Sequence, residues 1–350
     1  MNSFLFLVSA SQKIGFGHFN RSTTIAQYIH SEYRSKIEIA LISEDGGEVD
    51  EEFAGPNYAI FQLQSLENLK DFILSKKYDV IITDFMYNDF YNDHEYEVFF
   101  NELASTESFI VAIDNLGSNS LYERKENFFK ILLRPYVCED YFEQSNENYL
   151  LLQGPQFSIL CPEYKAKPVV SHPNIAEKIL ITFGGSDTKH YTTRFMKLID
   201  SVSRPLELKV VSGPYFSQSL KDDIQKLSKN SLHFFDIIEA PLSLFDLMRW
   251  ADIAVSLNGL TKYELAASGL PSLLLSTDNQ QDESNAEFSK YQTAVNLKSD
   301  SSDTEILLNF MSLLDDLKLR QKLAENGTKL VDGEGIQRFA KILERECEKR

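Results

Sequence analysis

Residues 4–29 read FLFLVSASQKIGFGHFNRSTTIAQYI, and this stretch predicts the kind of fold before the rest of the chain is considered. An apolar run of strand length leads into a turn with two glycines, and Ile25 and Ile29 then share one face of a helix. A glycine-rich turn from strand to helix is typical of parallel α/β sheets, because glycine lets the backbone approach a ligand. His18 and Arg21 follow the glycines directly, so this turn is also a candidate functional site.

The alternation of strand and helix continues along the chain and begins again in its second half. Apolar runs of strand length stand at 37–43, 78–84, 108–114, 178–183, 206–213, 252–258 and 271–277, with helical segments between them. Continuous apolar runs of this kind fit parallel strands that are buried on both faces. The segment 151–173 contains four prolines and no clear period, which makes it the best candidate for a linker. The pattern therefore predicts two α/β domains with parallel sheets.

The composition limits the classes of partner. With 52 acidic and 35 basic residues the net charge is −17, which argues against nucleic acid or an anionic membrane as the main partner. A small anionic substrate stays compatible, because backbone N–H groups can hold it. No apolar run approaches the roughly 20 residues of a membrane span, and no basic leader precedes the first strand, so we expect neither a membrane segment nor a signal peptide. The widely spaced Cys138, Cys161 and Cys347 indicate a reduced, cytoplasmic chain.

Three glycine-containing loops follow expected strands and open helices, at 13–21, 183–189 and 257–264. Ligands of open α/β sheets bind at the carboxyl ends of strands, where a following helix offers free N–H groups to an anion. None of the three loops has the spacing of a dinucleotide or P-loop fingerprint. Together they favour a phosphorylated ligand held between two domains. The chain has no D-x-D and no His/Cys/Asp cluster with metal spacing, so we expect chemistry without a metal.

Two side chains of the first loop have alternative interpretations. His18 would lie in the first turn of its helix, where the positive dipole end disfavours imidazolium and leaves a neutral ring that can accept a proton. The alternative is a histidine that caps its own turn. Arg21, one turn further on, would pair with a phosphate or a carboxylate, or would form an ordinary surface salt bridge.

Glu264, Asn279 and Gln280 are candidates in the second half of the chain. A carboxylate about one turn into the helix after NGLT can accept hydrogen bonds from the vicinal hydroxyls of a ribose. The alternative is that Glu264 only stabilises the start of its helix. The amides at 279 and 280 follow a strand and precede a helix, where they would hold a sugar or cap that helix.

These motifs together resemble the UDP-sugar hydrolases of the pseudaminic acid pathway, which are relatives of the lipid II-forming GlcNAc transferase and have the GT-B fold. The stretches that carry the resemblance are IGFGHFNR at 14–21, LQGPQFSILCPEY at 152–164, ILITFGGSD at 179–187, the donor-site region at 251–275 with DNQ at 278–280, and VDGEGIQRFAKIL at 331–343. The resemblance runs almost end to end. It implies two Rossmann-like domains that face a cleft.

The resemblance also implies roles for individual residues. On the sugar side, His18 would be the general base, with Gly17 and Arg21 in the same loop and helix. Asn279 and Gln280 would contact the sugar or the diphosphate.

On the nucleotide side, the resemblance implies a diphosphate cradle and a ribose site. Gly184, Gly185 and Ser186 would cradle the diphosphate. Glu264 would bind the uridine ribose, and the start of its helix, Gly259 and Thr261, would lie near phosphate.

Four positions depart from the family pattern: Leu7, Ser9, Phe85 and Met86. The first two stand where relatives carry Arg and Asp, and the last two where relatives carry His and Tyr after a retained Asp84. Tyr87 would replace the missing tyrosine only by a shift of one residue. The nucleotide end is therefore expected to be kept, while the sugar or the acceptor has changed.

The sequence thus predicts a GT-B-like α/β protein with an N-terminal domain at 1–160, a nucleotide-binding domain at 175–330 and a closing helix at 331–350 that packs back on the first domain. The expected activity is metal-independent, inverting hydrolysis of a UDP-activated amino sugar without a cofactor, in pseudaminic-type acid or surface polysaccharide biosynthesis. An inverting glycosyltransferase that uses the same donor is the first alternative. A non-catalytic nucleotide-sugar-binding protein is the second.

Overall fold

A computed structural model gives the fold of the chain. It describes residues 1–9, 17–42, 57–63, 65–85, 87, 94–114, 120–123, 128–138, 148–165 and 172–349. The chain divides into two compact units, each described below by itself. Unit 1 comprises Met1–Pro162 together with Glu334–Arg350, and unit 2 comprises Glu163–Gly333.

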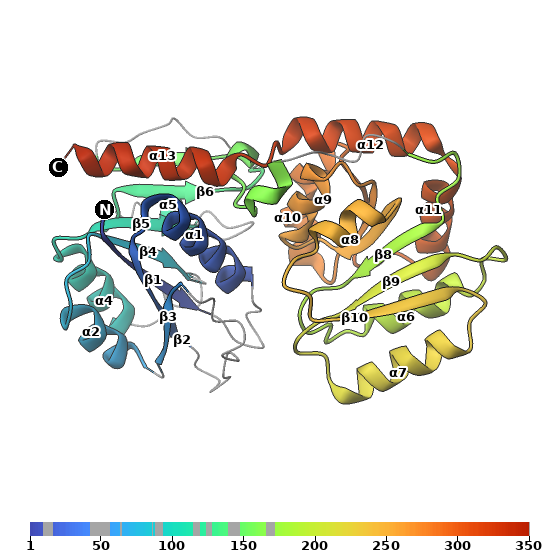
Figure 1. Ribbon diagram of the computed structural model, residues 1–350, viewed down its shortest axis with the longest axis horizontal. Helices are drawn as coiled ribbons and strands as arrows, with labels where there is room; N and C mark the ends of the chain where they lie inside the picture. The colour runs from blue at the N-terminus through green and yellow to red at the C-terminus, as the bar shows by residue number, and fades with distance from the viewer. Residues whose placement is uncertain are drawn as a thin grey trace. The chain divides into compact units, whose positions relative to one another are not determined.

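Unit 1 is built on a seven-stranded parallel sheet with the strand order β3-β2-β1-β4-β5-β6-β7 (Figure 1). Its strands are β1 (Ser3–Ser9), β2 (Lys36–Ile42), β3 (Ala59–Leu63), β4 (Val80–Asp84), β5 (Phe109–Ile113), β6 (Ile131–Arg134) and β7 (Leu150–Gln153). In the central pair, Val8 is in register with Asp84, so that the carboxyl ends of β1 and β4 lie side by side. Strand β7 begins at Leu150 and runs into the first residues of the stretch that the sequence suggested as a linker, because its three leucines pair with β6 and are largely buried.

Helices cover both faces of the unit 1 sheet. They are α1 (Gly17–Tyr33), α2 (Leu66–Leu74), α4 (His94–Ala104), α5 (Ser120–Glu123) and α13 (Gly335–Glu348), with the short 3₁₀ helix η2 (Pro155–Phe157). Phe4 and Phe6 of β1 pack with α1 and with Phe339 of α13 on one face, and Leu5 and Leu7 pack with α2 and α4 on the other. The two groups of helices can be followed in Figure 1. The closing helix of the chain is therefore part of the core of unit 1.

Unit 2 is a six-stranded parallel sheet with the order β10-β9-β8-β11-β12-β13 (Figure 1). The strands are β8 (Lys178–Thr182), β9 (Glu207–Ser212), β10 (Phe234–Glu239), β11 (Ile253–Leu257), β12 (Ser272–Leu275) and β13 (Val295–Leu297). The helical segments are η3 (Pro162–Lys165), whose first residue belongs to unit 1, α6 (Tyr191–Ile199), α7 (Gln218–Lys229), α8 (Phe245–Trp250), α9 (Thr261–Ala267), α10 (Asn279–Lys290), α11 (Asp303–Asp315) and α12 (Leu317–Leu330). One core joins the β-strands to α6, α7 and α11 through side chains such as Phe195, Leu220 and Phe310.

The two ends of unit 2 lie against each other. Gly333, its last residue, has a φ of +73°, and a Cβ there would come within 2.8 Å of backbone atoms of Tyr164 and Lys165. Only glycine combines this left-handed conformation with so close a backbone approach. The segment at Tyr164 and the segment at Gly333, where the chain enters and leaves unit 2, are therefore packed backbone to backbone.

Candidate functional site

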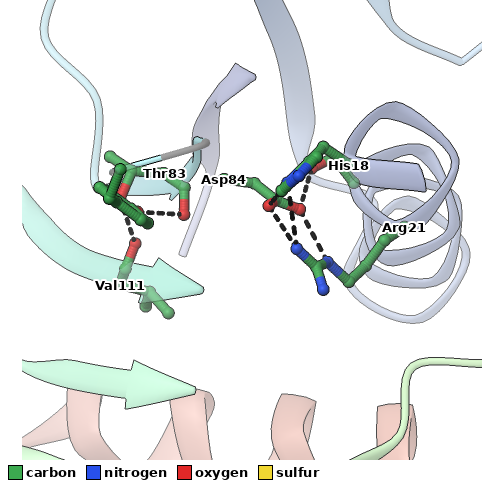
Figure 2. A network of polar contacts seen from close by, with 7 residues as sticks. His18, Arg21, Thr83, Asp84 and Val111 are labelled. Atoms are coloured by element: carbon green, nitrogen blue, oxygen red, sulfur yellow. Dashed lines mark hydrogen bonds and ion pairs between the residues drawn. The ribbon is translucent and has the colours of Figure 1, made fainter. Parts of the chain in front are cut away.

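In unit 1 a buried carboxylate organises the residues of the first helix. Asp84, the last residue of β4, is fully buried and accepts hydrogen bonds from three side chains of α1 (Figure 2). His18 Nδ1 lies 2.6 Å from Oδ1, and Arg21 binds both oxygens, with Nε 2.8 Å from Oδ2. Ser22 Oγ donates to Oδ2 at 3.2 Å. The spacing of positions 18, 21 and 22 places all three side chains on one face of the helix.

The protonation of this cluster follows from the charges around Asp84. Burial alone would raise the pKa of Asp84, but Arg21 and His18 outweigh it and hold that pKa below its ordinary value. An ionised carboxylate only accepts hydrogen bonds, so His18 donates through Nδ1, and in the neutral form of the ring the lone pair is on Nε2. Arg21 Nη2 lies 3.3 Å from Nδ1 and donates to the same oxygen of Asp84. The ring is thus fixed in the tautomer that a general base requires.

The structure shows which groups the two side chains of the first loop contact. Among the described residues, His18 bonds a distant carboxylate with its side chain 12% exposed. Arg21 is only 5% exposed, pairs with Asp84 and stacks over the Tyr136 ring at 5.4 Å, so it forms a buried ion pair within unit 1 and not a surface salt bridge. Gly17 begins α1, and the preceding glycine of the loop, at position 15, lies outside the described residues. In the sequence, Asp84 stands out only as a residue that the resembled family also has. Its place at the carboxyl end of an apolar strand is the feature that could have predicted a role in the site.

Of the four positions that depart from the pattern of the resembled family, the three that the structure describes are interior. Leu7 and Phe85 are in the apolar core, and Ser9 is buried at the end of β1. Tyr87 is fully buried, and its hydroxyl bonds Thr83 at 2.7 Å (Figure 2). Met86 lies outside the described residues.

In unit 2 the loop after β8 presents backbone N–H groups. A Cβ on Gly213 would lie 2.5 Å from the carbonyl oxygen of Gly184 and 2.4 Å from that of Gly185, so both carbonyls face Gly213. Gly185 O also accepts from Tyr215 N at 2.9 Å. Because the peptide bonds are trans, the N–H groups of Gly185 and Ser186 point the opposite way. With Gly184 at a φ of +83°, these successive N–H groups form the kind of concave backbone site that binds anions.

The helix that follows this loop has no free N-terminus, which corrects one expectation. Asp187 accepts hydrogen bonds from the N–H groups of Tyr191 and Thr192, both at 2.8 Å, and so caps α6 with its own carboxylate. Burial raises the pKa of Asp187, opposed by these hydrogen bonds. The sequence suggested that this helix start would bind a diphosphate. Asp187, three residues after the first glycine, occupies two of those N–H groups instead.

Asn279 and Gln280 are exposed in the first turn of α10. They do not cap the helix, since that position belongs to Asp278, which accepts from Gln281 N at 2.9 Å. Their capping alternative is thus wrong. The Oδ1 of Asn279 lies 3.4 Å from Ser299 Oγ.

Glu264 lies half-buried on α9 and is held by another segment of unit 2. Tyr164 donates its hydroxyl to Oε1 of Glu264 at 3.2 Å. Burial raises the pKa of Glu264 to about 7, against the lowering effect of the Tyr164 and Thr261 hydroxyls. Thr261 starts α9, whose N-cap Leu260 makes no side-chain cap, and a Cβ on Gly259 would meet open space. Gly259, Thr261 and Glu264, which the resemblance implies for the nucleotide, therefore lie together at the start of α9.

The lysine beside these residues points elsewhere. Lys262 is buried, its amine bonds Asn285 Oδ1, and it lies 4.7 Å from the centre of the Phe288 ring. Burial lowers the pKa of Lys262 to about 7. This residue ties α9 to α10.

The remaining features of the described residues concern metal binding, membrane spanning and cavities. They contain no group of three or more His, Cys, Asp or Glu side chains placed to hold a metal ion. Within the same described part, no helix has the length and apolar character to cross a bilayer. A cavity of about 700 Å³ is lined by residues that include Asn2, Asp79 and Cys347. It lies at the amino ends of the unit 1 strands, the opposite edge from Asp84.

Comparison with known proteins places this geometry in context. No family model matches the chain. The spore coat polysaccharide biosynthesis protein SpsG of Bacillus subtilis is 26% identical over 204 residues, which cover 56% of this chain and 59% of that protein. The uncharacterized protein MJ1062 of Methanocaldococcus jannaschii is 23% identical over 289 residues, 79% of this chain and 56% of that protein. The chain thus spans somewhat more than half the length of these relatives.

Solved structures share the fold over nearly the whole chain. MurG of Acinetobacter baumannii gives a TM-score of 0.67 at 12% identity, covering 98% of this chain and 99% of that one. The spinosyn forosaminyltransferase SpnP gives 0.63 at 11% identity, with 99% of each chain covered. MnaA of S. aureus, solved with UDP, gives 0.59 at 12% identity and covers 97% and 95%. The chain has a GT-B-like fold of two parallel-sheet α/β units, and the predicted fold class is confirmed.

Proposed function

We propose that this protein is an enzyme that acts on a nucleotide sugar, and that it transfers the sugar to an acceptor hydroxyl with inversion at the anomeric carbon. The observation that carries the proposal is the contact between Asp84 and His18 Nδ1, which leaves Nε2 to accept a proton. A binding protein needs no oriented base, whereas a transferase does. The transferase names of fold relatives such as the spinosyn forosaminyltransferase support this choice over hydrolysis.

The proposed reaction divides the work between the two units. In unit 1, His18 Nε2 takes the proton of the acceptor hydroxyl as its oxygen forms a bond to the anomeric carbon. The bond from that carbon to the diphosphate oxygen breaks, and its electron pair leaves with the diphosphate. In unit 2, the N–H groups of Gly185 and Ser186 stabilise the charge on the leaving diphosphate. Glu264 accepts hydrogen bonds from the ribose, and Asn279 and Gln280, exposed at α10, reach the sugar or the diphosphate.

Hydrolysis of a UDP-activated amino sugar is the second candidate. It uses the same groups, with water in place of the acceptor hydroxyl. The motif resemblance around IGFGHFNR favours it. The buried apolar residues at positions 7 and 85, where the resembling family carries polar side chains, favour the transferase. In either case a role in surface polysaccharide synthesis is part of the proposal, and the name of the B. subtilis relative supports it.

The experiment is a turnover assay with a panel of uridine, guanosine, cytidine and thymidine diphosphate or monophosphate sugars. Each is incubated alone and with candidate acceptors, in ¹⁸O-labelled water. A transferase releases nucleotide only when an acceptor is added, and the label enters no product. Early label in the free sugar without acceptor would establish the hydrolase. Absence of turnover with every donor and acceptor, despite nucleotide-sugar binding, would contradict both enzyme proposals.

A further inference from the structure

The hydroxyl of Tyr164 donates a hydrogen bond to Glu264, the carboxylate proposed above to bind the ribose. The two residues are 100 positions apart in the chain, and Tyr164 Oη lies 3.2 Å from Glu264 Oε1. The tyrosine is 3% exposed, so its hydroxyl is a buried donor that needs an acceptor. A tyrosine hydroxyl supplies one hydrogen, which engages one carboxylate oxygen and leaves the remaining lone pairs of Glu264 for a ligand.

The orientation of the Tyr164 ring is fixed on several sides. Phe245 of α8 meets it edge to face, with ring centres 5.2 Å apart and planes at 83°. The hydroxyl also lies 3.8 Å from Met248 Sδ. The backbone of Tyr164 is in close contact with Gly333, where any side chain would collide. The donor therefore has a fixed position, while Glu264 is a longer, half-buried side chain with more rotamers to lose.

We propose that Tyr164 is a positioning residue that holds the Glu264 carboxylate where it accepts hydrogen bonds from the two vicinal hydroxyls of a ribose. This inference rests on the nucleotide-sugar function proposed above. A carboxylate that is held before the ligand arrives loses less conformational entropy on binding. The tyrosine hydroxyl also favours the ionised form of Glu264, which is the better acceptor. Tyr164 stands next to the entry of the chain into unit 2, so the same contact ties that entry segment to the nucleotide site.

The test measures recognition of the ribose rather than overall affinity. Binding of UDP and of 2′,3′-dideoxy-UDP is measured by calorimetry for the wild type, Tyr164→Phe and Glu264→Gln. Ser268→Ala is the matched control, because its hydroxyl touches the same Met248 sulfur at 3.5 Å. The hydrogen bond of Ser268 to Glu264 runs from backbone N–H to backbone O at 2.9 Å, so the alanine variant keeps it. The wild type should prefer UDP by roughly tenfold to a hundredfold, the range for hydrogen bonds to a charged group.

Tyr164→Phe should reduce this preference by about threefold to tenfold, the worth of one further hydrogen bond, while its affinity for dideoxy-UDP stays near that of the wild type. Ser268→Ala should keep the full preference. A purely structural role of Tyr164 would weaken both ligands equally and leave the ratio unchanged, which would overturn the proposal.

The outcomes separate this inference from the proposed function. If Glu264→Gln loses the preference and Tyr164→Phe keeps it, the positioning role is wrong and the nucleotide site stands. If the wild type binds no nucleotide with a preference for ribose, the proposed ligand itself is wrong. Should Tyr164→Phe fail to fold, the preference for UDP over 2′,3′-dideoxy-UDP is measured with Glu264→Asp instead. Its shorter carboxylate withdraws from the hydroxyl, and an unchanged preference in that variant would contradict the proposal.

Discussion

Asp84 holds His18 across 66 residues of sequence, with 2.6 Å between Oδ1 and the Nδ1 atom of the ring. The same carboxylate neutralises Arg21, which would otherwise be a buried cation. One side chain at the end of β4 thus fixes the tautomer of the proposed base and satisfies the charge beside it. This double role makes the cluster sensitive to each of its members in a different way.

Replacement of the proposed base should abolish turnover and leave the nucleotide site intact. His18→Asn should lower kcat by at least about a hundredfold, the low end of what a general base contributes. UDP affinity should not change, because the residues proposed for the nucleotide are in unit 2. His30→Asn, on the same helix with its ring bonded to Ser35 O, is the control. If the variant keeps kcat within about threefold of the wild type, instead of losing about a hundredfold, His18 is not the general base.

Removal of the Asp84 charge should affect both catalysis and stability. In Asp84→Asn the asparagine amide can donate to Nδ1 of His18, which favours the tautomer with its proton on Nε2. This tautomer cannot accept a proton at Nε2, so kcat should fall by about 10²–10⁴-fold. Arg21 is left without its counter-charge, and such a loss costs about 3–5 kcal/mol of unfolding free energy. Urea unfolding and steady-state kinetics measure the two effects separately.

The sign of the pH effect at Asp84 provides the control for that variant. The pKa of Asp84 is lower in the folded chain than in the unfolded one, so its stabilisation is present above the unfolded pKa and is lost as the pH falls through the folded value. The free-energy difference between wild type and Asp84→Asn should therefore shrink in acid. A difference that stays constant down to acid unfolding would show that the carboxylate is not ionised in the fold.

Loss of the Asp187 carboxylate at the start of α6 should lower the stability of the fold without lowering the affinity for UDP. Asp187→Ala should cost about 1–2 kcal/mol of unfolding free energy, since two N–H groups at the helix start lose their acceptor. UDP affinity should stay the same or rise, because a negative charge next to the proposed diphosphate cradle is removed. Asp316→Ala is the control, because Asp316 caps another helix of unit 2, α12, by accepting from Leu319 N at 2.9 Å. A large fall in UDP affinity for Asp187→Ala would instead give this carboxylate a direct role in binding.

Glu264 should make nucleotide binding depend on pH. Burial raises the pKa of Glu264 to about 7, so the carboxylate that accepts hydrogen bonds best is formed as the pH rises through that value. The two nearby cations have other partners, since Arg249 of α8 stacks over Phe245 and Lys262 bonds Asn285. The pKa of Glu264 is therefore set by its burial and by the hydroxyls of Tyr164 and Thr261. The ratio of UDP affinities between wild type and Glu264→Gln should therefore increase from about pH 5 to about pH 8. Titration of the diphosphate itself cancels in this ratio.

Folding stability should change in the opposite direction. A carboxyl whose pKa is raised in the fold contributes most below its unfolded pKa, and this contribution is lost as the pH rises through the folded value. Relative to Glu264→Gln, the empty wild-type protein should lose stability from about pH 4.5 to about pH 7, by at most about 3 kcal/mol. Thermal unfolding at several pH values tests this, and a flat difference would show that Glu264 titrates at its ordinary pKa.

The sequence by itself determined the class of fold and the places where chemistry was to be sought. Apolar runs such as 4–8 and 179–182 are long enough for strands and too short for helices, and the glycines after them permit the turns, so these are local properties. The same local reasoning predicted that His18 and Glu264 each follow a strand at the start of a helix. It also predicted unoccupied N–H groups at the start of α6, which was wrong, because the Asp187 carboxylate accepts hydrogen bonds from the N–H groups of Tyr191 and Thr192.

Tertiary structure alone decided which side chains meet. The pairing of β1 with β4 in register brings Asp84 to the start of α1, and no spacing in the sequence records that pairing. The contact of Tyr164 with Glu264 likewise depends on how η3 packs against α8 and α9. Such contacts depend on strand order and on the packing of distant segments. Burial then strengthens them, because charges and hydrogen bonds shielded from water interact more strongly than the same groups do in an open chain.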